Sequence, residues 1–185
     1  MKRLLLTGFS AFPGAPHNPT ETLVTALAQQ APDHLITRVL PVIWQDAETR
    51  MAALIETVKP DAILHLGLAT QRPHVSVETR ARNECSLTTP DANNICRASG
   101  TIDAKGPGLR HARMDCTRVV ETLRAAGLTT ELSDDAGDYL CNHTLYLSLG
   151  SAVPQVGFIH LPTPTDEMPL TAMQKGIEAV LRSLA

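Results

Sequence analysis

The chain is poor in aromatic side chains and carries no large excess of charge of either sign. Only six of its 185 residues are aromatic: Phe9, Phe12, Trp44, Tyr139, Tyr146 and Phe158. The formal net charge is -3, whereas proteins that bind nucleic acid or an anionic membrane carry an excess of basic residues. We therefore expect neither partner. Because 43% of the residues are hydrophobic, the core must consist mainly of aliphatic side chains, and any gathering of rings is informative.

Long hydrophobic runs and closely paired metal ligands are also missing. Only three leucines separate Arg3 from Thr7, which is too short for a signal peptide or a membrane span. We therefore expect a cytoplasmic protein whose thiols stay reduced. The four cysteines form no C-x-x-C pair and the seven histidines form no H-x-H or H-x-x-x-H pair, so we expect no metal and no other cofactor.

Apolar runs alternate with helical patterns from end to end. Strands are predicted at 2–6, 35–42, 62–66, 75–77, 129–132 and 155–161, and helices at 19–30, 44–58, 109–126, 137–149 and 170–184. Strands that alternate with helices and are apolar on both faces indicate an α/β fold. We predict a single three-layer α/β/α domain over 1–185, with a mostly parallel central sheet. The polar stretch 83–108 is long enough to be a functional or mobile loop.

Ligands of such folds bind beyond the carboxyl ends of the strands. Four segments are predicted to leave strands at that edge of the sheet: 7–19, 67–83, 134–142 and 160–164. Candidate functional residues are therefore sought in these segments.

Cys141 follows a small-residue turn and falls in the first turn of a predicted helix. The positive end of a helix lowers the pKa of a thiol, and the N–H groups there can bind an oxyanion. The alternative is a small buried hydrophobic residue, as most unpaired cysteines are.

His160 and Glu78 are the candidate partners of this thiol. His160 lies near the end of an apolar strand that Pro162 stops, and Glu78 ends the strand 75–77. A carboxylate there could orient an imidazole to take a thiol proton. His143 is a competing base, but it lies two residues after Cys141 on one helix, so the two side chains diverge by roughly 200°. The alternatives are a histidine bonded to backbone and a solvated glutamate.

Four motifs occur in order along nearly the whole chain. They are Leu6-Thr7-Gly8-Phe9-Ser10-Ala11-Phe12-Pro13-Gly14 with Asn18-Pro19, His65-x-Gly67 with Arg72 and Val77-Glu78-x-x-Ala81-x-Asn83, Ser133-x-x-Ala136-Gly137-x-Tyr139-Leu140-Cys141-Asn142, and Gly157-Phe158-Ile159-His160-Leu161-Pro162. In these motifs the chain resembles the pyrrolidone-carboxylate peptidase (pyroglutamyl peptidase I) family of cysteine peptidases.

The resemblance implies that Glu78, Cys141 and His160 are catalytic. It implies release of an amino-terminal pyroglutamyl residue from peptides, by thiolate attack and a thioester that water hydrolyses. It also implies a homo-oligomer, either a dimer or a tetramer.

The substrate ring is a small, flat, neutral lactam, which requires apolar walls and a few hydrogen bonds. Phe9 and Phe12 resemble the phenylalanines that sandwich this ring in the family, with Tyr139 and Leu140 as further walls. Asn18 would hold the loop that carries both phenylalanines. The alternative for these phenylalanines is ordinary core packing.

Three positions depart from the family pattern. Thr88 stands where an arginine is common, Tyr139 where phenylalanine is usual, and Leu68 where glutamine is frequent. The change at Thr88 raises the alternative of a weakened or silent pyroglutamyl-ligand binder. A nucleoside phosphorylase has a similar fold, but the loop at Gly8 is too poor in glycine and arginine to hold phosphate.

Overall fold

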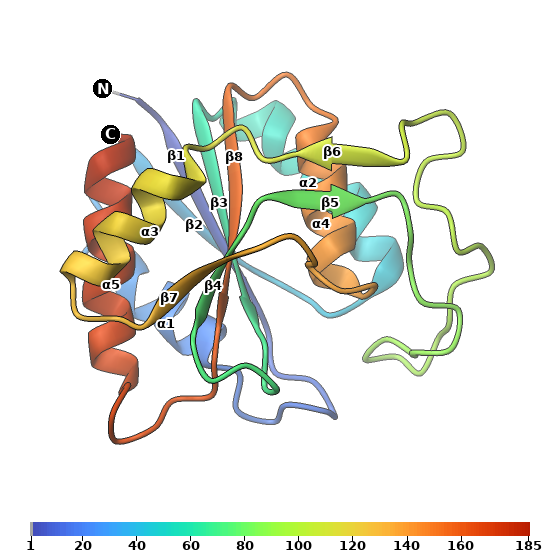
Figure 1. Cartoon of the computed structure of the whole chain (residues 1–185). Coiled ribbons are helices and arrows are strands. Elements are labelled where there is room, and N and C mark those ends of the chain that lie inside the picture. Colours follow the sequence, from blue (N-terminus) through green and yellow to red (C-terminus); the bar gives the residue numbers. More distant parts are fainter. Residues whose placement is uncertain (1) are drawn as a thin grey trace.

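A computed structural model describes residues 2–185 and shows a six-stranded sheet between two layers of helices (Figure 1). The strands of this sheet stand in the order β2-β1-β3-β8-β4-β7. Their bounds are β1 Leu4–Phe9, β2 Leu35–Leu40, β3 Ala62–Leu68, β4 Val75–Glu78, β7 Thr130–Ser133 and β8 Gln155–Leu161. The helices are α1 Pro19–Ala28, α2 Trp44–Val58, α3 Cys116–Ala125, α4 Leu140–Leu149 and α5 Leu170–Leu184.

Helices α1, α3 and α5 cover one face of the sheet, and α2 and α4 cover the other (Figure 1). A hydrophobic core lies on each face of the sheet, and alternate residues of β1 point into one or the other. Leu6 packs on the side of α5, and Leu5 packs on the side of α4. The predicted α/β/α architecture with a mostly parallel sheet is confirmed. Within residues 2–185, no helix combines the length and apolar character needed to cross a bilayer.

The direction of β4 differs from the prediction. It runs antiparallel to β8, with Ser76 opposite His160 and Glu78 opposite Phe158. Glu78 therefore does not emerge at the carboxyl edge of the parallel strands; it is fully buried beside the middle of β8. The prediction that it lies at that edge was wrong, because a short strand that is buried on both faces carries no signal of its direction.

Two helices begin later than predicted. Residues 109–126 do not form one helix: β6 (Leu109–His111) pairs with β5 (Arg80–Arg82) as a hairpin, and α3 begins only at Cys116. The carboxylate of Asp115 caps α3 by accepting a hydrogen bond from the Arg118 N–H at 3.0 Å. The α4 helix starts at Leu140 instead of 137, because the φ angle of +81° at Gly137 is incompatible with a right-handed helix.

The polar stretch 83–108 joins β5 to β6 and is fastened along its length. Asp91 accepts the Trp44 N–H at 3.1 Å, and the Ser86 N–H donates to the Asp138 carbonyl at 2.7 Å. The side chain of Asn142 bonds to the backbone at the start of this segment. The segment is therefore held against α2 and the start of α4.

Candidate active site

Cys141 is the second residue of α4 and is half-buried. Tyr139 precedes the helix in an extended conformation, and the first helical hydrogen bond runs from the His143 N–H to the Tyr139 carbonyl at 3.1 Å. The N–H groups of Leu140 and Cys141 come before that bond, at the positive end of the helix. The predicted position of Cys141 in the first turn of a helix is confirmed.

His160 and Glu78 form a direct pair across β8 and β4. The His160 Nδ1 atom lies 2.7 Å from Glu78 Oε1, and both side chains are buried. The Phe158 ring packs against the imidazole with a centroid distance of 4.7 Å. An acceptor at Nδ1 places the ring proton there, so Nε2 is the nitrogen that can take a proton.

The thiol lies over β3, next to this pair. Gly67 is the register partner of His160, and a Cβ atom built at Gly67 would stand only 2.8 Å from Cys141 Sγ and 2.6 Å from the Phe158 ring. Glycine at 67 therefore lets α4 approach the strand. The structure brings together the three side chains that the sequence singled out.

Burial and charge set the protonation states of Cys141 and Glu78. Burial raises the pKa of the Cys141 thiol to about 12, the charge of Glu78 acts in the same direction, and the charge of Arg72 lowers it. Burial also tends to raise the pKa of Glu78, but His160, Ser133 and Arg72 outweigh it, and the pKa lies below its ordinary value. The carboxylate is therefore ionised beside a neutral thiol, which needs a base to become a nucleophile.

A small cavity of about 50 Å³ opens beside Cys141. Its other lining residues are Phe9, Phe12, Asn18, Val42, Leu68, Tyr139 and Leu140. Asn18 accepts the Thr20 N–H at 3.1 Å to cap α1 and donates to the Ser10 carbonyl at 3.2 Å, which ties down the loop of the phenylalanines. All five predicted pocket residues line this cavity; Val42 was missed, since one aliphatic residue after a strand carries no functional signal.

The pyroglutamyl peptidase family model matches residues 2–181. This chain belongs to the pyroglutamyl peptidase family. It is 32% identical over 199 residues to the pyrrolidone-carboxylate peptidase of Oceanobacillus iheyensis, an alignment that covers 100% of both chains. It is 32% identical over 167 residues to that of Pyrococcus furiosus, covering 86% of this chain and 80% of the relative.

Solved structures of family members have the same fold. The pyrrolidone carboxyl peptidase from Thermococcus litoralis matches with a TM-score of 0.89 and 29% identity, over 98% of this chain and 92% of that one. The Bacillus amyloliquefaciens pyroglutamyl peptidase I matches with a TM-score of 0.87 and 25% identity, over 97% and 94%. The chain is thus a hydrolase of the pyroglutamyl peptidase I class, and the comparisons support this activity over a silent ligand binder.

Tyr139, which replaces the phenylalanine usual in pyroglutamyl peptidases, bonds to the long loop. Its hydroxyl donates to the Pro90 carbonyl at 2.9 Å, and its ring packs edge-on against Trp44 at 5.1 Å. Burial raises the pKa of Tyr139 to about 12, so the hydroxyl stays protonated as a donor. Thr88 is exposed, with its hydroxyl 3.5 Å from that of Ser86. The extra hydroxyl therefore ties the segment that contains Thr88 to the wall of the cavity.

Removing this hydroxyl should loosen the loop without touching the chemistry. We expect Tyr139→Phe to raise KM by roughly 2- to 10-fold, the equivalent of one lost hydrogen bond, with kcat nearly unchanged. Steady-state kinetics on a pyroglutamyl amide measures both. Tyr146→Phe is the matched control, because Tyr146 donates a similar bond to the Pro107 carbonyl of the same loop. A large fall in kcat at constant KM for Tyr139→Phe would contradict the expectation.

His143, the competing base, points away from the trio. Its ring packs against Trp44 with a centroid distance of 5.5 Å, and its Nε2 lies 3.3 Å from Glu48 Oε1. Burial lowers the pKa of His143 to about 4, helped by the charge of Arg97. The geometry therefore favours His160 over His143 as the base for this family member.

Proposed function

We propose that Cys141, His160 and Glu78 are the catalytic triad that releases an amino-terminal pyroglutamyl residue from peptides. The observation that carries this proposal is the 2.7 Å contact between His160 Nδ1 and Glu78 Oε1, next to a thiol at the start of α4. Membership of the pyroglutamyl peptidase family supports it.

The reaction runs in two halves. As Cys141 Sγ bonds to the pyroglutamyl carbonyl carbon, His160 Nε2 takes the thiol proton and the N–H groups at the start of α4 bind the oxyanion. His160 then gives this proton to the leaving amine as the C–N bond breaks, which leaves a thioester. His160 next takes a proton from water, whose oxygen attacks the thioester, and returns it to the departing sulfur. Glu78 stabilises the imidazolium throughout.

The cavity suits a neutral ring. Phe9, Phe12 and Leu140 offer apolar walls, so a lactam can enter without desolvating a charge. A prolyl residue has a similar ring but carries an ammonium group, whose transfer into such walls costs free energy. The chemistry of the walls therefore favours the pyroglutamyl over the prolyl substrate.

A pair of reporter amides tests this proposal. We expect the wild-type enzyme to hydrolyse a pyroglutamyl amide about 100-fold faster or more, in kcat/KM, than the matching prolyl amide. Fluorescence of the released amine measures both rates. Equal rates would contradict the proposed pocket, and phosphate-dependent cleavage of a nucleoside in place of amide hydrolysis would favour the phosphorylase.

We also propose that 1–185 is one catalytic domain, that the enzyme works in the cytoplasm, and that it assembles as a dimer or tetramer. The resemblance to the family supports the assembly, the length of the chain supports the single domain, and the four unpaired cysteines support the location. Each statement stays a prediction.

A further inference from the structure

Arg72, in the loop between β3 and β4, contacts the buried carboxylate of the triad. Its Nη1 lies 2.7 Å from Glu78 Oε1, and its Nη2 donates to the Asp135 carbonyl at 2.5 Å. The Arg72 side chain is 26% exposed and that of Glu78 is 0% exposed. One carboxylate oxygen thus accepts from both the guanidinium and His160. Arg72 therefore joins β4 to the turn that leads to Cys141.

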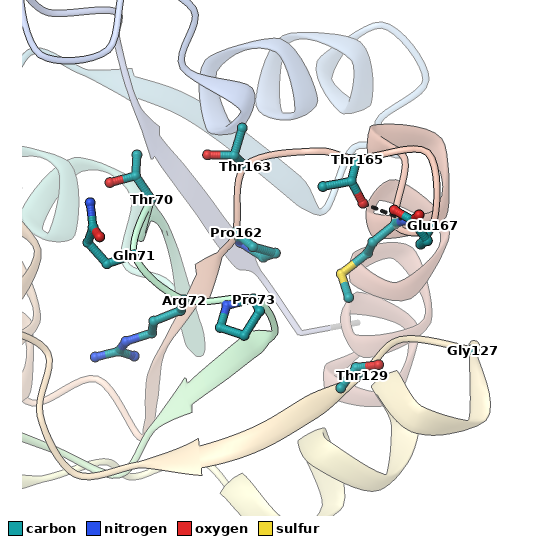
Figure 2. A pocket seen from close by; sticks show the side chains of 11 residues that line it. Thr70, Gln71, Arg72, Pro73, Gly127, Thr129, Pro162, Thr163, Thr165 and Glu167 are labelled. Carbon is teal, nitrogen blue, oxygen red and sulfur yellow. Dashed lines mark hydrogen bonds between the residues drawn. The ribbon is translucent and has the colours of Figure 1, made fainter.

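Arg72 also borders an open cleft of about 660 Å³ on the other side of its loop. Its walls include Pro73, Thr129 and Pro162. Figure 2 shows the guanidinium of Arg72 extending away from Pro73, Pro162 and Thr129. The charge of Arg72 is therefore directed to the triad and away from these walls of the cleft (Figure 2).

Two other arginines hold the same turn. Arg80 donates to the Asp134 carbonyl at 2.8 Å and pairs with its carboxylate at 2.7 Å, and Arg82 pairs with Asp135 Oδ1 at 3.0 Å. These arginines contact the turn, whereas Arg72 contacts both the turn and Glu78. Substitution of Arg80 therefore serves as a control, because it removes contacts with the turn but none with the Glu78 carboxylate.

We propose that Arg72 is a positioning residue of the triad, which fixes the Glu78 carboxylate toward His160 and keeps a positive charge beside the carboxylate and the thiol. This inference rests on the proposed function. In this role Arg72 supplies the site with a positive charge, in a chain that has Thr88 where the family commonly has an arginine.

The charged and polar groups around the triad determine in which direction a change at Arg72 shifts the pKa of the Cys141 thiol. Glu78, on β4, faces His160 from β8, Arg72 from the loop, Ser133 from β7 and Cys116 from α3. Cys141 faces Glu78 and Arg72, and Tyr139 lies two residues before it in the chain. Because the charge of Arg72 lowers the pKa of the Cys141 thiol, its removal raises that pKa, and thiolate forms only at higher pH.

Kinetics and thiol alkylation of Arg72→Met, Arg72→Lys and Arg80→Met test the proposal. We expect Arg72→Met to lower kcat about 10- to 100-fold, the effect that supporting partners of functional groups commonly have, with a smaller change in KM. The pH midpoint of Cys141 alkylation by iodoacetamide, followed by peptide mass spectrometry, shifts upward in this variant. Arg72→Lys keeps the positive charge but loses the two guanidinium nitrogens that contact Glu78 and Asp135 together. We therefore expect kcat to fall while the pH midpoint of alkylation stays near that of wild type. Arg80→Met changes neither.

Three outcomes would overturn the proposal. The first is a wild-type kcat in Arg72→Met, and the second is an unshifted alkylation midpoint in that variant. The third is an equal loss of kcat in Arg80→Met, which would show that Arg72 acts only by holding the turn. If Arg72→Met does not fold, Arg72→Lys decides, and a wild-type kcat there overturns the proposal. Failure of the wild-type enzyme on a pyroglutamyl amide would instead refute the proposed function, because alkylation needs no substrate.

Discussion

Cys141→Ala is expected to abolish hydrolysis of a pyroglutamyl amide, with a loss in kcat of roughly 10⁴-fold or more. Alanine keeps the small side chain above Gly67 and the start of α4, but it has no atom that can form the thioester. The cavity walls and Asn18 stay in place, so the variant should still bind the substrate. Single-turnover kinetics and competition with pyroglutamate measure the two properties separately.

Cys116→Ala is the matched control for this variant. Cys116 is also half-buried and is the first residue of α3, as Cys141 is the second of α4. Its sulfur lies 3.6 Å from the backbone carbonyl of Glu78, and burial raises the pKa of the thiol. We expect Cys116→Ala to keep wild-type kcat. Turnover that survives in Cys141→Ala would refute covalent catalysis by this thiol.

Glu78→Gln has the second-largest expected effect, a loss of roughly 10³- to 10⁴-fold in kcat. The amide is isosteric, but its one oxygen is neutral, and its NH₂ group cannot accept from either His160 or Arg72. The imidazolium that forms during the reaction loses its counter-charge, and the His160 ring loses the acceptor that sets its tautomer. Steady-state kinetics of the variant on a pyroglutamyl amide measures the loss.

The stability of Glu78→Gln should depend on pH in a defined direction. The folded-state pKa of Glu78 is below the ordinary value of 4.5, so its ionisation stabilises the fold above that pH, and the contribution is lost as pH falls through the folded-state pKa. The gap in free energy of unfolding between wild type and variant should therefore shrink in acid. Glu48→Gln is the control, since Glu48 contacts Arg97 and His143 away from the triad, and kcat should persist. Near-wild-type kcat in Glu78→Gln would contradict the orienting role.

The local sequence was sufficient to predict helices and strands that have regularly spaced apolar residues or a clear terminating or capping residue. Residues 44–58, 155–161 and 170–184 have the predicted bounds in α2, β8 and α5. Pro162 ends β8, and the Asn18 cap begins α1 as predicted. Each of the three residues proposed as catalytic combines reactive chemistry with the end of an element, although Glu78 was selected for an edge position that the direction of β4 does not give it.

Features that depend on distant partners could not be predicted. The β6 strand exists only because β5, almost 30 residues earlier, pairs with it. Arg72 was noted within a motif but given no role, because a loop arginine is indistinguishable from a solvated one until the burial of Glu78 is known. Trp44 lay outside every motif, yet it packs edge-on against Tyr139 and so joins the rings around the cavity.

The central place of β8 has a consequence for how activity arises during folding. This strand begins at Gln155 and inserts between β3 and β4, so the middle of the sheet stays open until most of the chain is available. His160 is 82 residues from Glu78 in sequence, and contacts of such separation form slowly. A nascent chain that ends before β8 contains the thiol of Cys141 but lacks His160, its proposed base. We therefore expect peptidase activity to arise only when β8 has entered the sheet.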